Sequence, residues 1–288
     1  MNEKILDLPA LQWYPGHMKR AKDIITENLS LVDVVVELLD ARAPISSANP
    51  MLAEILKGKP RVVVLNKADL ADEKITREFI ADFKAQNIKA VAIDAKEGRG
   101  VKETVKAIEI LAKPYTEKWA KAGAKKRVAR CMILGIPNVG KSTLINRLAG
   151  SAKTKTADKP GVTRNKQWIK IGADLELLDT PGILWPKFDD MQVGLNLAFI
   201  GAISDDVMDI EKIAALLAEK IRDDNKEAMR DRFKIEDSEL TGEEIVEVIG
   251  KKRGCLVKGG IVDTEKAARI LINEFRSGKL GRITLENV

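Results

Sequence analysis

The segment from Gly135 to Ser142 constrains the fold of this chain more than any other feature. It reads Gly-Ile-Pro-Asn-Val-Gly-Lys-Ser, which fits G-x-x-x-x-G-K-[ST], and it lies between an apolar run at 128–134 and an amphipathic stretch at 141–148. In a strand–loop–helix unit, such glycines let successive backbone N–H groups turn toward phosphate oxygens at a helix N-terminus that favours anions. The sequence therefore predicts a phosphate-binding loop inside a domain of alternating strands and helices. The alternative, a chance glycine turn, does not explain the flanking pattern.

The polar residues of this loop match the needs of a nucleoside triphosphate. We expect Lys141 to reach the β- and γ-phosphates and the Ser142 hydroxyl to ligate Mg²⁺. The loop and the first helical turn are expected to contact the nucleotide through Asn138, Val139, Gly140, Lys141, Ser142 and Thr143. These residues alone leave the base of the nucleotide open.

Two segments that end other strands indicate the base. Asn66-Lys67-Ala68-Asp69 follows the apolar run 61–65, and the Asp69 carboxylate can accept from both N1–H and the N2 amino group of guanine, a donor pair that adenine lacks. Asn66 can bond the base and brace the loop, while the stem of Lys67 covers the base face. Asp94-Ala95-Lys96 follows the next strand and can offer backbone N–H groups to guanine O6. Together they predict GTP and GDP as ligands.

Two more segments are suited to detecting the γ-phosphate. Asp179-Thr180-Pro181-Gly182 follows the apolar run 175–178, so Asp179 is placed to hold the metal through water and Gly182 to donate its N–H to the γ-phosphate. Thr163 lies between this turn and the phosphate loop, where it can complete Mg²⁺ coordination. The alternative for Thr163 is a plain surface residue. A loop that orders with the γ-phosphate and relaxes after hydrolysis is a nucleotide-dependent switch.

Short apolar runs alternate with helical spacing through the first part of the chain. Val32–Leu39, Arg61–Asn66 and Lys89–Ile93 are predicted to be buried strands, with helical spacing at Met51–Leu56 and Thr76–Ala85 between them. This is the βαβ rhythm of a parallel sheet with helices on its faces. Further along, Gln167–Ile171 and Leu175–Leu178 are expected to pair as strands, and the basic segment 113–127 is interpreted as a solvated connection or an RNA contact.

The pattern changes to helices beyond residue 190. Ser204 is expected to cap a helix over Val207–Ile221, and Thr241 with Glu244 forms a capping box that opens the next helix. Asp263 can cap a last helix that ends near residue 278. An α/β domain is therefore expected to precede a smaller all-α domain.

Composition sets limits on the class of protein. The 288 residues are 45% hydrophobic and 32% charged, which is typical of globular chains, and no apolar run reaches the roughly 20 residues of a membrane helix. The N-terminal residues do not read as a secretory signal, and Cys131 and Cys255 are expected to be reduced and buried, as in cytoplasmic proteins. The net charge of +6 suits a nucleic-acid or ribosome partner, with solubility alone as the alternative.

Taken together, these motifs resemble the full set of a TRAFAC-class GTPase, in an unusual order. The two guanine-recognition segments precede the phosphate loop, so the chain resembles a circularly permuted GTPase. The similarity is closest to the YlqF/RbgA family, the ribosome biogenesis GTPases A, and extends to the segments Trp13–Met18, Leu39–Pro44 and Asp179–Leu184. It covers nearly the whole chain. One departure is Asp94, where the family has serine, which puts the bracing of that loop in doubt.

The resemblance implies a fold and a function. The fold is a circularly permuted phosphate-loop GTPase domain over 1–190, with a parallel-rich sheet and helices on both faces, followed by an all-α RNA- or ribosome-binding domain over 191–288. The function is hydrolysis of GTP to GDP and phosphate during late assembly of the bacterial large ribosomal subunit, stimulated by that subunit. The implied partners are the large subunit and its rRNA, and no membrane is implied. The resemblance also implies a cytoplasmic monomer, although organellar relatives share most of the motifs. An RNA-binding scaffold with a structural nucleotide site, or a GTPase with another partner, are the alternatives.

Permutation makes the turn at Asp179–Gly182 run directly into the helical domain. Since that domain must supply one anchor of the turn, the state of the γ-phosphate can bias how the two domains pack. This is a hypothesis, and an identical domain orientation with a GTP analogue and with GDP would reject it.

The residues for hydrolysis are less certain than those for binding. Ile183 occupies the position where many GTPases place a glutamine that orients water, so intrinsic hydrolysis should be slow. His17, the only histidine in the chain, is the group that the resemblance implies for catalysis, and the alternative is an anchoring or RNA-contacting role. Asn138 is implied to coordinate an activating K⁺, unless it only shapes the loop. Lys251–Arg253 and Lys258 form a basic cluster that suits RNA phosphates or merely a solvated face.

Overall fold

The computed structural model describes residues 23, 25–50, 52–56, 58–121, 128–150, 167–179 and 190–288. The chain divides into two compact units. The helical unit comprises Asp190–Leu285, and the sheet unit comprises the described residues before it together with Glu286–Val288. The last three residues of the chain therefore belong to the sheet unit again.

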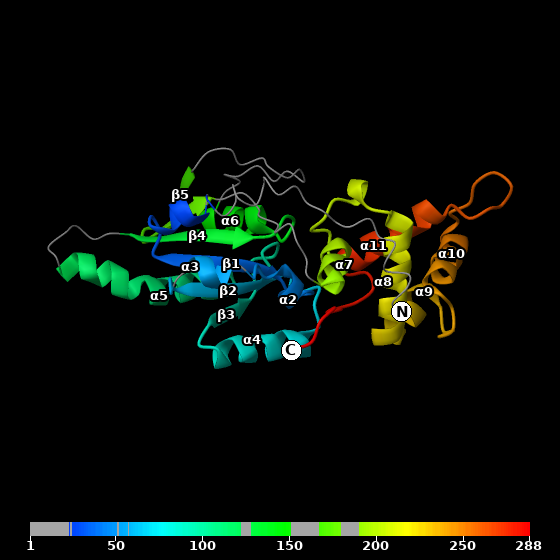
Figure 1. The fold of residues 1–288 in the computed structure, drawn as a ribbon, viewed down its shortest axis with the longest axis horizontal. Coiled ribbons are helices and arrows are strands. Elements are labelled where there is room, and N and C mark those ends of the chain that lie inside the picture. Colours follow the sequence, from blue (N-terminus) through cyan, green and yellow to red (C-terminus); the bar gives the residue numbers. More distant parts are fainter. Residues whose placement is uncertain are drawn as a thin grey trace. The chain divides into compact units, whose positions relative to one another are not determined.

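A mostly parallel sheet organises the sheet unit (Figure 1). Its order is β3-β2-β1-β4-β6-β5, and every neighbouring pair is parallel except β5 with β6. The strands are β1 Val34–Asp40, β2 Arg61–Asn66, β3 Lys89–Ala92, β4 Ala129–Gly135, β5 Gln167–Ile171 and β6 Leu175–Asp179. The predicted strands are confirmed, with ends shifted by at most two residues. Because the parallel strands share a direction, their carboxyl ends meet at one edge of the sheet.

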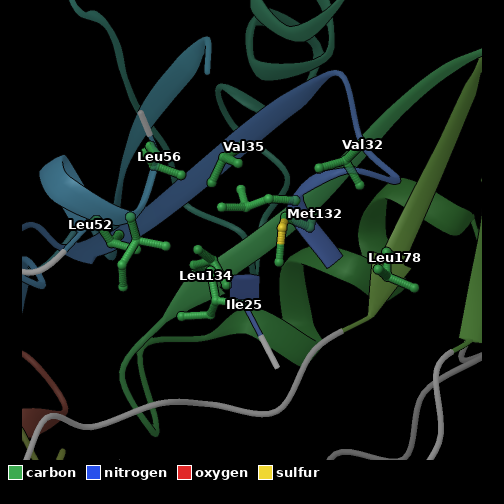
Figure 2. Packing of buried hydrophobic residues seen from close by; sticks show 10 residues of the cluster. Ile25, Val32, Val35, Leu52, Leu56, Met132, Leu134 and Leu178 are labelled. Atoms are coloured by element: carbon green, nitrogen blue, oxygen red, sulfur yellow. The ribbon is translucent and has the colours of Figure 1, made fainter. Parts of the chain in front are cut away.

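Helices cover both faces of this sheet. They are α2 Pro44–Ser47, α3 Leu52–Leu56, α4 Glu73–Ala85, α5 Val101–Lys121 and α6 Lys141–Ala149. On one face, α3 and the helical residues 25–29 pack on side chains of β1, β4 and β6, and α4 packs on β2 through Phe79. Figure 2 shows the first of these clusters, in which Leu52 and Leu56 of α3 approach Val35 and Met132. The alternate side chains of β1, β2 and β4 face α5, which contacts all three strands.

The interpretation of segment 113–127 as a connection is wrong for residues 113–121, and the remaining residues of the segment lie outside the described part of the chain. Its described part continues α5 as far as Lys121, with Pro114 inside the helix. Opposite charges at helical spacing explain this, since Lys113 Nζ lies 3.7 Å from Glu117 and the Thr116 hydroxyl donates to the Lys113 carbonyl at 3.1 Å. The number of lysines conceals the helical period of the segment.

The helical unit is built around α8. Its elements are α7 Met191–Phe199, the 3₁₀ turn η1 Asp205–Val207, α8 Ile210–Asp224, α9 Lys226–Phe233, α10 Gly242–Arg253 and α11 Thr264–Arg276. The helix α8 contacts each of the other four α-helices, and its buried stripe includes Ile213, Leu217 and Ile221. These elements confirm the predicted change to helices after residue 190.

The helix starts in this unit test the capping predictions. The capping box of Thr241 and Glu244 is present at α10, and the Asp263 side chain accepts from Lys266 N at the start of α11, so both predictions are confirmed. The cap at Ser204 is wrong, because Ser204 caps only η1 and Met208 is extended. The long helix begins at Ile210, where Asp209 accepts from Lys212 N. Because a second capping residue, Asp209, follows Ser204 closely, the chain first forms the short turn η1 and starts the long helix α8 only at Ile210.

Two expectations from composition are also answered for the described residues. No helix among them is both long and apolar enough to cross a bilayer. Cys131 in β4 and Cys255 after α10 are both buried with free thiols, as expected. Burial, followed by the nearby charge of Asp33, raises the pKa of the Cys131 thiol to about 12, so it stays protonated at neutral pH.

Candidate nucleotide site

The predicted binding segments come together at the carboxyl edge of the sheet. The strand β2 ends at Asn66, β3 leads into Asp94, β4 ends at Gly135, and β6 ends at Asp179. These strands are parallel neighbours of one another or of β1, so the loops that follow them lie at one edge. This is where ligands bind in open α/β sheets.

The phosphate loop has the backbone geometry that its glycines predict. Gly140 has φ of 98°, and a Cβ atom there would overlap the Nδ2 atom of Asn66. A Cβ on Gly135 would lie 2.8 Å from the carbonyl oxygen of Leu38. Since real Cβ contacts are longer, a side chain at position 135 would strike the backbone of β1 and one at position 140 would strike the buried Asn66 side chain, so both positions require glycine. Gly140 also precedes α6 without a side chain to cap it, which leaves the first turn open toward an anion.

The remaining loop residues lie where the motif predicts. Val139 is buried under the loop, and Asn138 is exposed with φ of 58°. Lys141, Ser142 and Thr143 form the first turn of α6 and are partly exposed. The structure therefore brings all the described members of the predicted phosphate loop to one place.

Asn66 joins the phosphate loop to the segment Asp94–Lys96, here called the base loop. Its Nδ2 donates to the Val139 carbonyl at 2.7 Å, and its Oδ1 accepts from Ala95 N at 3.0 Å. The side chain is buried, so these bonds replace water that it has lost. Its predicted bracing role is therefore present across three loops that are far apart in the sequence.

The segment after Asn66 is also fixed to its neighbours. Lys67 Nζ donates to the Asn138 carbonyl at 2.8 Å, and Ala68 N donates to the Ile93 carbonyl at 3.0 Å. Asp69 is exposed beyond these bonds. An exposed carboxylate on a fixed loop is suited to accept donors from a ligand.

Asp94 braces the base loop, which resolves the doubt raised by its replacement of serine. Its Oδ1 accepts from the backbone N–H groups of Lys96 and Glu97, each at 3.0 Å, and its Oδ2 bonds Arg99 at 2.5 Å. In this structure the N–H groups of Ala95 and Lys96 thus each have an internal acceptor. Guanine O6 would have to compete for them or share them.

Arg147 is a contributor that sequence reasoning missed. It lies on α6 and donates to the carbonyls of Ala95, at 3.3 Å, and Lys96. The helix that follows the phosphate loop thereby holds the base loop. The sequence shows only that Arg147 lies on the helix after the phosphate loop. This is a weak signal, because an arginine at another position on that helix would look the same.

A buried charge cluster beneath the loops was also missed. Asp40 and Arg42 are both fully buried, and Lys67 Nζ lies 2.9 Å from Asp40 Oδ2. Burial opposes ionisation of Asp40, but the charges of Arg42 and Lys67 outweigh it, so its pKa lies well below the ordinary value. The sequence signal was a charged residue ending the apolar run of β1.

Several predicted site residues lie outside the described part of the chain. These are His17, Thr163, Gly182 and the side chain of Asp179. The backbone of Asp179 is described, and it pairs with Gln167 as the last residue of β6. The roles assigned to these four residues remain predictions.

A parallel sheet that brings a G-x-x-x-x-G-K-[ST] phosphate loop and the segment Asn66–Asp69 to its carboxyl edge is typical of a GTPase. The recognition loops belong to β2 and β3, which precede β4 in the sequence but lie on the other side of β1 in the sheet. Because these loops precede the phosphate loop in the sequence, whereas the usual order starts with the phosphate loop, the domain is circularly permuted.

Comparison with known proteins narrows this class. The family profile described as "50S ribosome-binding GTPase" matches residues 130–248. A Bacillus cereus protein named ribosome biogenesis GTPase A is 48% identical over 96% of this chain and 93% of its own length. A Thermotoga maritima protein of the same name is 33% identical, with 96% and 94% covered. The chain belongs to the ribosome biogenesis GTPase A family.

Solved structures agree with this assignment. The crystal structure of GNP-bound YlqF from T. maritima matches with a TM-score of 0.66 and 29% identity, covering 93% of this chain and 98% of that one. A GDP-bound YlqF structure matches with a TM-score of 0.64 over the same shares. The chain is thus a GTPase of ribosome biogenesis with the YlqF fold.

Proposed function

We propose that this GTPase acts as a switch in late maturation of the large (50S) ribosomal subunit, and that the subunit stimulates its hydrolysis of GTP. The match to the family described as "50S ribosome-binding GTPase" supports the role at the 50S subunit, and Ile183 at the position where many GTPases place a glutamine supports stimulation by a partner. Without a glutamine to orient water, hydrolysis by the protein alone should be slow. A partner that completes the catalytic site would then set the timing.

The metal ligands are part of this proposal. Ser142 lies in the first turn of α6, and the N-cap residue of this helix, Gly140, has no side chain to cap it. In phosphate-loop proteins a hydroxyl at this place faces the bound phosphate. We assign Mg²⁺ to Ser142, Thr163 and Asp179, whose hydroxyl and carboxylate oxygens are ligands that Mg²⁺ prefers. The bound ion would neutralise charge on the phosphates. Activation by K⁺ through Asn138 is the corresponding proposal for a monovalent ion, and equal turnover in K⁺ and Na⁺ would reject it.

His17 is proposed to position or polarise the attacking water. A neutral imidazole with an ordinary pKa near 6.5 suits that task at neutral pH. His17→Ala should abolish subunit-stimulated turnover and leave the affinity for GDP unchanged. Unchanged turnover would remove His17 from the reaction.

The partner surface is proposed to be RNA-binding, and its charge distribution favours the sheet unit. Residues 190–285 hold 16 Lys and Arg against 19 Asp and Glu, whereas the rest of the chain holds 33 against 24. The segment 113–127 alone has six basic residues and one acidic residue. Its described part lies on α5, where Lys118 is exposed and Lys113, also exposed, pairs with Glu117. Phosphate backbones attract such a concentration of positive charge.

Three members of the basic cluster predicted in the helical unit already bond other residues of that unit. Lys251 Nζ lies 2.7 Å from Glu247, Lys252 Nζ donates to the Lys234 carbonyl at 2.7 Å, and Arg253 bonds Glu274 at 3.2 Å. These side chains are still exposed, and Lys258 lies on the exposed loop that follows them. RNA contact by this unit therefore stays part of the proposal, with local contacts at the end of α10 in place of a large basic face.

Two measurements with purified large subunits test the function. Multiple-turnover GTP hydrolysis should increase at least tenfold when subunits are added, and the protein should co-sediment with them in a GTP analogue but not in GDP. Binding without any hydrolysis would favour an RNA-binding scaffold with a structural nucleotide site. GTP hydrolysis that large subunits do not affect would favour another RNA or protein partner. A monomeric, cytoplasmic protein is expected, which light scattering and cell fractionation would check.

A further inference from the structure

The strand β1 carries two buried carboxylates, and they differ in what they reach. Glu37 is 3% exposed and pairs with Arg61 at 3.0 Å, while Asp40 is 0% exposed and pairs with Arg42 at 2.8 Å. Burying an ion pair costs desolvation energy, and the electrostatic attraction within the pair does little more than offset that cost. The pair of Glu37 with Arg61 makes no bond to a loop of the nucleotide site, although Glu37 lines a small cavity together with Gly135 and Ile136. Asp40 does bond such a loop, because its second cationic partner is Lys67.

Arg42 holds the Asp40 carboxylate in one orientation. The Arg42 backbone N–H and Nε both donate to Oδ1, at 3.1 and 2.9 Å, and its terminal nitrogen donates to Oδ2 at 2.8 Å. A bidentate guanidinium fixes both the position and the plane of a carboxylate. The Oδ2 atom is thereby aimed at Lys67 Nζ, 2.9 Å away.

Lys67 links the oriented Asp40 carboxylate to the phosphate loop. Its ammonium bonds the Asp40 carboxylate and donates at 2.8 Å to the carbonyl of Asn138, in the middle of the loop. Lys67 and Asn138 are both in the left-handed region, with φ of 59° and 58°. The left-handed conformation costs a lysine residue about 1 kcal/mol or more, so contacts with neighbouring residues must stabilise it.

We propose that Asp40 is a positioning residue of the nucleotide site: oriented by Arg42, it fixes the Lys67 ammonium against the Asn138 carbonyl and so preorganises the phosphate loop. The inference rests on the assignment of residues 66–69 and 135–142 to nucleotide binding. Preorganisation lowers the cost of ordering the loop when nucleotide binds. Its loss should appear mainly as faster nucleotide release.

A double-mutant cycle on release of a fluorescent GDP analogue tests the proposal. Asp40→Asn should speed release about tenfold, which corresponds to the loss of one charge-assisted bond. Lys67→Met keeps the apolar stem and removes the ammonium, and it should have a similar effect. Because both act through one contact, the double variant should release nucleotide no faster than the worse single variant. Additive effects, or an unchanged rate in Asp40→Asn, would overturn the proposal.

Two control variants separate this role from general stability and from the site assignment. Glu37→Gln changes the other buried carboxylate of β1 and should lower the melting temperature while leaving GDP release within twofold. An equal increase in GDP release for Glu37→Gln would show that damage to β1 alone explains the Asp40 result. Lys141→Ala should weaken GDP binding, and if it does not, the assignment of the phosphate loop fails rather than the role of Asp40.

A paired replacement covers the case in which Asp40→Asn does not fold. Asp40→Asn with Arg42→Met removes the fully buried carboxylate and guanidinium together and leaves only the ammonium of Lys67, whose side chain is partly exposed, so this variant should fold and show the same faster release. Release at the wild-type rate from this folded variant would contradict the proposal.

Discussion

The two units of the molecule use buried carboxylates for different ends. In the sheet unit, Asp40 and Asp94 bond groups in loops at the carboxyl edge of the sheet. In the helical unit, Glu274 of α11 bonds Arg232 of α9 at 2.6 and 2.7 Å and Arg253 of α10 at 3.2 Å. The same chemistry therefore shapes a binding site in one unit and joins helices in the other. The difference implies that changes to the first set should affect nucleotide binding, and changes to the second should affect stability.

The helical unit also uses its arginines within its own fold. The Arg253 guanidinium lies 5.4 Å from the centre of the Phe233 ring, and the hydrogen bond from Arg232 to Glu274 lowers the pKa of that carboxyl. A basic side chain with an internal partner contributes less to an external one. Charge counts taken from the sequence alone overstate the surface that this unit offers to RNA.

The largest effect on the binding side is expected at Asn66. Asn66→Ala removes the acceptor of Ala95 N and the donor to the Val139 carbonyl, and it disconnects the two loops. Two lost bonds at a buried position amount to about 3 kcal/mol, or roughly a hundredfold in GDP affinity. Titration calorimetry with GDP measures it. An affinity within threefold of wild type would show that the loops do not need this bridge.

The largest effect on the stability side is expected at Glu274. Glu274→Gln removes the charge that Arg232 and Arg253 share and should lower the free energy of unfolding of the helical unit by about 2 kcal/mol, with GDP affinity unchanged. Urea denaturation followed by helical circular dichroism measures this.

A matched control lies on the same helix. Glu265 pairs with Arg269 at 2.8 Å, but both side chains are about half exposed, at 60% and 47%. Glu265→Gln should therefore cost less than about 0.5 kcal/mol. If the Glu274→Gln and Glu265→Gln variants had the same free energy of unfolding, burial of the Glu274 cluster would not contribute to stability.

Arg147→Met should have a smaller effect on the binding side. Its bonds to the Ala95 and Lys96 carbonyls hold the base loop from α6, and losing them should weaken GDP binding about fivefold, or about 1 kcal/mol. Arg77→Met removes an exposed pair with Glu73 on α4 and should leave affinity unchanged. Equal affinities for the two variants would exclude α6 from control of the base loop.

Local patterns explain what the sequence predicted well. Runs of Val, Ile and Leu marked the strands, and loop motifs marked the segments that end them, since both depend on neighbouring residues. The loops then met at one edge because parallel strands require it. The capping box at Thr241 is equally local.

One of the failures depends on contacts between distant parts of the chain, and two others are local. Asp40 looked like the polar end of a strand until Lys67 and Asn138 were placed beside it. The bracing by Asp94 was doubted because a family pattern favours serine, although a carboxylate can accept the same two backbone donors. The helical part of segment 113–127 was hidden by its charge, which does not by itself oppose a helix.

The smallest predicted effect is a pH dependence confined to the helical unit. The Arg232 hydrogen bond lowers the pKa of Glu274 in the folded state, so the carboxylate contributes stability above its unfolded pKa of about 4.3, and this contribution is lost as pH falls through the lower folded value. The difference in unfolding free energy between the wild type and Glu274→Gln should therefore shrink between pH 7 and pH 3. Since only the ionic part titrates, the change is smaller than the full effect of the substitution. A difference that stays constant with pH would assign the stability to packing of the side chain, and Glu274 would then resemble the apolar residues around it rather than the carboxylates of the sheet unit.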